Sequence, residues 1–290
     1  MTRIQAASAC VATAVCIGGI APHAQQNTQQ STDSVTVNLS DPSRPGTVQV
    51  HVRGGSITVK GGNRKDVLVS PGPSGDSPAR SERGRGGRQG RGGDQTPDDV
   101  PPGLKRLTPP SGFSIEERNN EVEINSRFAR SRNFEIQVPA RTNLDLSSRG
   151  GPIVVEGVEG EIEVQSNGGP VTLTDVAGAV VATSHGGSVT ARLSRVSADK
   201  AMSFTSFGGD VDVTLPASVK ANVKLRSLQG DVYTNFDLLQ QKPAAKTSTT
   251  RKDGSFHFEA NDTIVGMING GGPEIELRTY SGRVLLRKGP

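Results

Sequence analysis

Residues 151–191 read GPIVVEGVEGEIEVQSNGGPVTLTDVAGAVVATSHGGSVTA, with a glycine every nine residues, at Gly151, Gly160, Gly169, Gly178 and Gly187. The second and fourth residues after each glycine are aliphatic: Ile153/Val155, Ile162/Val164, Val171/Leu173, Val180/Ala182 and Val189/Ala191. Because alternate side chains of a strand point to one side, each unit predicts a short strand with one apolar face. A fixed short period of turn plus strand is typical of a solenoid, whose units bury their apolar faces against their neighbours.

The sequence therefore predicts an all-β protein built as a β-solenoid, a β-helix-like stack of short strands. Similar strands in successive nine-residue units suggest two half-units in each eighteen-residue turn of the coil. An antiparallel β-sandwich is the alternative, because regularly spaced turns of three or four residues also suit hairpins. The constant spacing over five units favours the solenoid. Glycine suits the corners, since it permits positive φ or a close backbone approach.

The same period-two alternation extends on both sides of the repeat. It predicts N-terminal strands of the β domain within 25–70 and the repeat solenoid over 113–290. Between them, residues 71–112 are rich in Arg, Gly and Pro, and Arg83 to Arg91 contains no apolar residue. Such a segment buries too little surface to offset its ordering entropy, so we expect 71–112 to be a disordered insertion.

The N-terminus has the pattern of an export signal. Arg3 precedes an apolar, small-residue run from Ala6 to Ala21, which predicts a signal peptide over 1–24. A membrane anchor is the alternative, but the run is short and rich in Ala and Gly for a span of about 30 Å. Cys10 and Cys16 both lie within this segment, so a processed chain would contain no disulfide and no cysteine site.

Composition narrows the functional classes. The formal net charge is +4, tryptophan is absent and tyrosine occurs twice. This scarcity of large aromatic faces counts against carbohydrate processing. Arg-Gly tracts can bind single-stranded nucleic acid, but the tract here lacks interleaved aromatics and is followed by Asp94, Asp98 and Asp99. We therefore expect no nucleic-acid partner.

No motif in the sequence assigns a catalytic, cofactor-binding or metal-binding residue. His51, His185 and His257 lack metal-ligand spacing, and His185 lies in a turn, where we expect it to be solvated. Asp210, Asp212 and Asp231 form the best acidic group. If their units stack, Asp210 and Asp231 could meet at neighbouring corners and hold calcium, but two carboxylates are too few for that ion. Acidic turn residues that bind local backbone amides are the favoured interpretation.

Several segments together resemble a known family. The stretch from Leu144 to Val155, Ser206 to Val213, Leu228 to Tyr233 and Thr279 to Leu286 are similar to the Ser-x-x-Gly-Asp-Ile/Val units of the bacterial putative-adhesin domain family of unknown function. The resemblance covers most of residues 34–287 and implies a right-handed β-helix-like fold and a surface role. Pro or Ser often replaces the Asp after Gly, and the family offers no catalytic residue to transfer.

Three functional hypotheses follow. The first is a non-enzymatic exported protein of the bacterial cell envelope, periplasmic, surface-bound or secreted, which acts as a structural or adhesion module with an unknown envelope or surface partner. The second is a β-helix enzyme that processes polysaccharides, which needs clustered ionisable groups such as Glu163, Asp212, Arg192 and Arg226. The third is an envelope scaffold that assembles end to end through exposed terminal strands.

Overall fold

The computed structural model describes residues 34–72, 113–126, 133–241, 248–252, 255–259 and 263–290. Every regular element within these ranges is a strand, which confirms the all-β prediction for the described part of the chain. The predicted signal peptide lies outside the described residues. The predicted insertion over 71–112 does too, apart from its first two residues.

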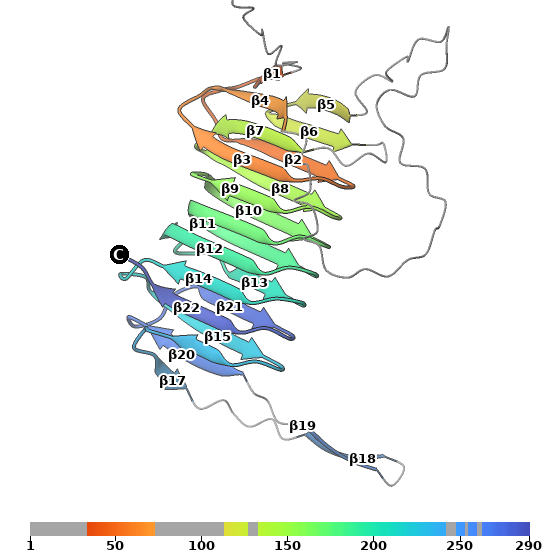
Figure 1. Cartoon of the computed structure of the whole chain (residues 1–290). Coiled ribbons are helices and arrows are strands. Elements are labelled where there is room, and N and C mark those ends of the chain that lie inside the picture. The colour runs from red at the N-terminus through yellow and green to blue at the C-terminus, as the bar shows by residue number, and fades with distance from the viewer. Residues whose placement is uncertain (1–33, 73–112, 127–132, 242–247, 253–254, 260–262) are drawn as a thin grey trace, which may run out of the picture. The chain divides into compact units, whose positions relative to one another are not determined.

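Twenty strands form one continuous sheet that folds into two faces, because β11 (Val171–Ser184) is long enough to contribute to both (Figure 1). Face 1 contains, in order of pairing, β5 (Phe113–Arg118), β6 (Glu121–Ser126), β2 (Gly46–Val52), β8 (Thr142–Ser148), β10 (Glu159–Ser166), the second half of β11, β13 (Met202–Ser206), β21 (Glu274–Thr279), β15 (Ala221–Ser227), β20 (Ile264–Ile268) and β17 (Leu239–Gln241).

Face 2 contains β1 (Val35–Asn38), β4 (Asp66–Pro71), β7 (Phe134–Pro139), β3 (Ile57–Gly62), β9 (Ile153–Glu156), the first half of β11, β12 (Val189–Val196), β14 (Val211–Leu215), β22 (Val284–Lys288) and β16 (Val232–Thr234). A separate two-stranded sheet consists of β18 (Ser248–Lys252) and β19 (Ser255–Glu259).

One strand of face 1, a corner and the following strand of face 2 make a unit that we call a rung; β8 and β9 form one such rung. Neighbouring rungs pair in parallel, with Ile162 opposite Leu144 on one side and Val180 on the other. On face 2, Val171 lies likewise between Ile153 and Val189. Each step is eighteen residues, which confirms two nine-residue half-units per turn of the coil.

The parallel pairing shows that the antiparallel sandwich is wrong for this chain. Antiparallel strands occur only towards the ends of the stack, where β5 covers β6, β4 covers β7 and β20 covers β15. The handedness of the coil stays a prediction.

Both faces turn their aliphatic side chains into one shared core. All ten aliphatic residues of the five predicted pairs are buried, and they belong to a single apolar cluster. Each such side chain contributes about 1.5–3 kcal/mol when fully buried, so the stack derives its stability from contacts between rungs. Met202 and Phe204 of β13 join the same core, although the sequence pattern did not single them out.

The corner glycines are required mainly by close packing between rungs. A Cβ at Gly169 would lie 2.3 Å from the carbonyl oxygen of Gly151, and one at Gly187 would lie 2.5 Å from the nitrogen of Pro170. Neither glycine has a positive φ, whereas Gly178 does, at 116°. Of the two reasons that favour glycine at these corners, close approach therefore dominates.

The order of rungs departs from chain order at both ends of the stack. The rung β2–β3 lies between β6–β7 and β8–β9, although β6 and β7 come later in the chain. At the other end, β21–β22 lies between β13–β14 and β15–β16 (Figure 1). The C-terminal rung is therefore internal to the stack.

Candidate interaction surface

The corner that joins face 1 to face 2 repeats one local structure. A buried hydroxyl ends the face 1 strand and accepts a hydrogen bond from the glycine N–H three residues later, as Ser206 Oγ does from Gly209 at 2.9 Å. The same hydroxyl donates to a carbonyl of the preceding rung, here Gly187 at 2.8 Å. Thr279 makes the equivalent pair of bonds with Gly282 and Gly209. Ser206 and Thr279 thus each fix their own corner and that of the preceding rung.

This arrangement forces the residue after each hydroxyl to the outside. Its backbone N–H bonds the carbonyl at the corner of the preceding rung, as in Phe207 to Ser184 at 2.9 Å and Tyr280 to Ser206 at 3.1 Å. We call the resulting line of side chains the corner row; in stacking order it is Arg53, which follows Val52 in place of a hydroxyl, and then Arg149, Asn167, His185, Phe207, Tyr280 and Leu228. Successive members sit one strand spacing apart, about 4.8 Å.

One end of the corner row is aromatic and apolar. Phe207, Tyr280 and Leu228 are 46%, 49% and 42% exposed, in three consecutive rungs. His185 stacks on Phe207 with ring centroids 4.9 Å apart and an interplanar angle of 2°. Exposed residues of this size in neighbouring rungs form a contiguous apolar surface, which marks an interaction site more often than isolated exposed residues do.

Two arginines border the aromatic end. Arg226 of β15 lies directly opposite Arg278 of β21 in the parallel register, and each precedes its corner hydroxyl. Neither forms a salt bridge within the described residues. Like charges placed directly opposite in a sheet are destabilising, so this pair is an energetic cost to the free protein that an anion would relieve.

The other end of the corner row is basic and recessed. Arg53 and Arg149 lie in consecutive rungs, joined by the bond from Arg149 N–H to the Val52 carbonyl at 3.2 Å. Together with His51, Asn125 and Ser147, they line a hollow of about 520 Å³. No salt bridge neutralises either arginine among the described residues, and both are exposed.

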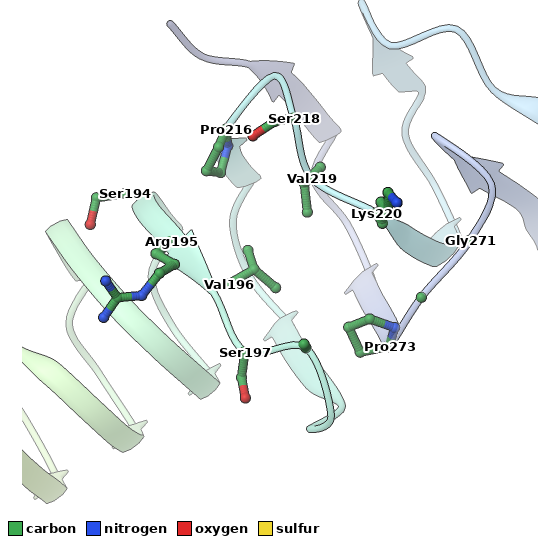
Figure 2. Close-up of a pocket in the computed structure, with 12 residues that line it drawn as sticks. Ser194, Arg195, Val196, Ser197, Pro216, Ser218, Val219, Lys220, Gly271 and Pro273 are labelled. Atoms are coloured by element: carbon green, nitrogen blue, oxygen red, sulfur yellow. The ribbon is translucent and has the colours of Figure 1, made fainter.

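A second hollow, of about 350 Å³, opens where face 2 returns to face 1 (Figure 2). Val196 and Val219 point into it, with Pro216 and Pro273 on its borders. Its neighbouring cation Arg195 is already held by the carboxylate of Glu159. The lining of this hollow is therefore mixed: Ser194, Ser197, Ser218 and Lys220 accompany the apolar residues, and its arginine is already paired.

The four ionisable residues suggested by the enzyme hypothesis are scattered. Glu163 and Arg226 lie on β10 and β15 of face 1, whereas Arg192 and Asp212 lie on β12 and β14 of face 2. Asp212 is bound to Arg287 at 2.8 Å. Because the four residues do not share a face, they form no catalytic cluster.

The proposed meeting of Asp210 and Asp231 at neighbouring corners is wrong. The rung β21–β22 lies between theirs, and its Arg283 occupies the corner position instead. Arg283 donates to Asp210 from its backbone N–H at 2.7 Å and from its guanidinium at 2.7 Å. These hydrogen bonds from Arg283 lower the pKa of Asp210 below its ordinary value. Asp231 accepts a bond from the Tyr233 hydroxyl.

His185 lies at an exposed turn, as expected, but its stacking on Phe207 was not predicted. The aromatic end itself was also missed, although a signal exists in the sequence. Aligning the Ser-x-x-Gly and Thr-x-x-Gly corners places Phe207, Tyr280 and Leu228 at the same position. The sequence gives no indication that their rungs are consecutive, because β21–β22 is inserted out of chain order.

Within the described ranges, His, Cys, Asp and Glu side chains form no group of three or more that could hold a metal ion. The same ranges contain no helix of the length and hydropathy needed to cross a membrane. Every deeply buried side-chain nitrogen or oxygen described has a hydrogen-bond partner. The polar groups of the interior thus serve the scaffold, and the unpaired charges lie at the surface.

Two solved structures are similar to the chain at low sequence identity. One is a putative cell adhesion protein from Clostridium sporogenes, with a TM-score of 0.41, 10% identity and coverage of 89% of this chain and 100% of that one. The other is a putative adhesin from Bacteroides fragilis, with a TM-score of 0.35, 11% identity and coverage of 89% and 97%. Among curated proteins, none matches the sequence significantly.

The decisive comparison is with a domain family. Its profile, described as Toastrack DUF4097, matches residues 114–284, which is more than half of the 290-residue chain. The match includes every corner from Ser126 to Thr279 and so confirms the resemblance inferred from the repeated corner motifs. The chain belongs to the Toastrack DUF4097 family.

Proposed function

We propose that this protein is a non-enzymatic interaction module of the bacterial cell envelope, exported to the periplasm or the cell surface, and that the corner row contacts its partner. The observation that carries the proposal is the aromatic end, where Phe207, Tyr280 and Leu228 are exposed side by side. A rigid stack of strands presents these side chains at a fixed spacing. Such preorganisation reduces the entropy lost on binding.

Two parts of the proposal concern the chain as a whole. Residues 1–24 act as the signal peptide, on the basis of their charge and small-residue pattern. The solenoid is right-handed, as the family resemblance implies. N-terminal sequencing of the protein recovered from the producing cells tests the first point: a mature chain that still begins at Met1 would contradict export by cleavage.

Binding to isolated cell envelopes tests the interaction role. We expect Phe207→Ser combined with Tyr280→Ser to abolish most co-sedimentation of the purified protein with envelope fragments. The matched control is Tyr233→Ser, which removes an exposed tyrosine from face 2, outside the corner row. All variants should retain the wild-type melting temperature, because the three side chains are exposed. Equal envelope binding by wild type and double variant would overturn the proposal.

A further inference from the structure

We propose that the corner row binds an acidic polysaccharide that runs along the stack, with sugar carboxylates at Arg53 and Arg149 and sugar rings on the aromatic end. This inference rests on the proposed function and names the chemistry of the partner. It follows from two kinds of group placed on one line by the same backbone ladder. Charge alone or aromatic surface alone would indicate a different ligand.

The basic end supplies a built anion site. Arg53 and Arg149 approach from consecutive rungs, and the hollow between their strands, about 520 Å³, also presents His51, Asn125 and Ser147. Guanidinium groups bind carboxylates in a bidentate manner, and neighbouring amide and hydroxyl groups add hydrogen bonds to the same anion. A hollow of this volume accommodates an acidic sugar unit together with its carboxylate.

The aromatic end suits the apolar face of a sugar ring. His185 and Phe207 stack in parallel, and Tyr280 follows in the next rung with its phenol exposed. Tyr280 and His185 combine an apolar ring with a polar atom that can bond a hydroxyl group, and Phe207 adds apolar area. The chain has only ten Phe and Tyr residues, so two in consecutive rungs at one corner are a local concentration in an aromatic-poor protein. Arg278 and Arg226 beside them provide a second place for a carboxylate.

Charge density distinguishes this ligand from a nucleic acid. The seven members of the corner row span six strand spacings, roughly 29 Å in all. A nucleic-acid strand carries one phosphate per ~3.4 Å and would bring about eight negative charges to that length. Only two members of the row are cationic. Face 1 beside the basic end also carries acidic side chains, among them Glu123, Asp145 and Glu163, which form no salt bridge within the described residues and would repel so dense a polyanion.

The same acidic face argues against an anionic membrane, which would approach as a plane and meet these carboxylates. An acidic peptide matches the arginines but lacks flat rings of hydroxyls and C–H groups for the aromatic end. A polymer in which carboxylated and neutral sugar rings alternate matches both ends of the corner row. Hyaluronan has this chemistry and serves as the probe.

The experiment measures the affinity of the purified protein for four polymers by calorimetry. They are hyaluronan, neutral dextran, poly-glutamate and oligo-deoxythymidylate, each at low and physiological salt. We expect binding to hyaluronan at least about tenfold tighter than to the other three, because only this polymer engages both ends. Preferential binding to poly-glutamate or oligo-deoxythymidylate would overturn the inference.

Variants locate the site. Arg53→Gln with Arg149→Gln should weaken hyaluronan binding about tenfold and reduce its salt dependence, because exposed ion pairs are screened by salt. Phe207→Ser with Tyr280→Ser should weaken binding by a similar factor without changing the salt dependence. Arg192→Gln is the control, since this exposed arginine also lacks a salt bridge but lies on face 2. Unchanged binding in both double variants would overturn the inference.

The outcome can be separated from that of the proposed function. If the double aromatic variant loses envelope binding while hyaluronan fails to bind the wild type, the proposed interaction module is supported and the acidic polysaccharide is excluded as its ligand. If the variant binds envelopes normally, the proposed function falls as well. Thermal melts of every variant exclude unfolding as the cause.

Discussion

The hydroxyl at each corner has few possible replacements. Ser166, Ser184 and Ser206 are at most 1% exposed, and each bonds both an amide of its own corner and a glycine carbonyl. The neighbouring glycines leave no room for a bulkier corner, since Cβ atoms there would meet backbone of the next rung. Only a small side chain with one donor and two acceptor sites fits this position.

Replacing Ser206 by alanine should therefore destabilise the protein by about 1–3 kcal/mol, because the Gly209 N–H and the Gly187 carbonyl lose a partner. Ser203→Ala in the same strand is the matched control, since Ser203 points outward and is half-buried. We expect the control to change stability by less than about 0.5 kcal/mol. Urea denaturation measures both values, and equal midpoints would show that the corner bonds contribute nothing.

Ion pairs between rungs add a pH-dependent contribution at the level of strand pairs. Arg283, just before β22, holds Asp210, just before β14, and hydrogen bonds from Arg283 lower the pKa of that carboxyl. A lowered folded-state pKa means that the stabilisation is present above the unfolded pKa, near 4, and is lost as the pH falls through the folded value.

We expect wild-type stability to fall between about pH 5 and pH 3 more steeply than that of Asp210→Asn, which has no carboxyl to protonate there. The measurement is the urea midpoint at each pH. Asp231→Asn is the control, because Asp231 has no salt bridge among the described residues. If Asp210→Asn and wild type show the same slope, the pair makes no pH-dependent contribution.

The positions of the strands could be predicted from the sequence, but which strands pair with each other could be predicted only in part. Alternation of buried and exposed residues is local, so Ile153, Val171 and Val189 could be placed inside the core before the structure was known. Within 144–191 the chain order equals the stacking order, and the eighteen-residue step followed. At the ends, pairing depends on chain segments more than forty residues apart, such as β15 with β21. No local pattern encodes that choice. The sequence therefore could not show that β21–β22 separates the corners of Asp210 and Asp231.

The internal position of the last rung predicts an unusual response to truncation. In a simple solenoid, removing the terminal unit leaves the remaining units paired. Here, removal of residues 274–290 takes β21 and β22 from between two other rungs. We expect hydrogen-exchange protection to be lost in β13 and β15 together, whereas a chain lacking only Pro290 keeps it. Retained protection in β15 of the truncated protein would contradict the observed order of rungs.

At the scale of the whole stack, the edge strands at its two ends determine whether copies of the chain can associate end to end. Unpaired strand edges promote association, and natural proteins limit it with short or charged edge strands. On face 1 the stack ends in β5, which carries Glu116, Glu117 and Arg118, and in β17 of three residues. On face 2 it ends in β1 of four residues and β16 of three.

Within the described residues, these edges differ in direction as well as length. β5, β1 and β17 are the outermost strands of antiparallel pairs, whereas β16 is the edge of a parallel one. On face 2, β1 and β16 run in the same direction, so a second copy placed end to end could pair there in parallel. On face 1, β5 runs opposite to β17, so the parallel pairing would not continue on both faces at once. We expect sedimentation equilibrium to return the monomer mass over a hundredfold range of protein concentration. A mass that rises with concentration, and that falls back when β16 is disrupted by Tyr233→Pro, would instead support the self-assembling scaffold.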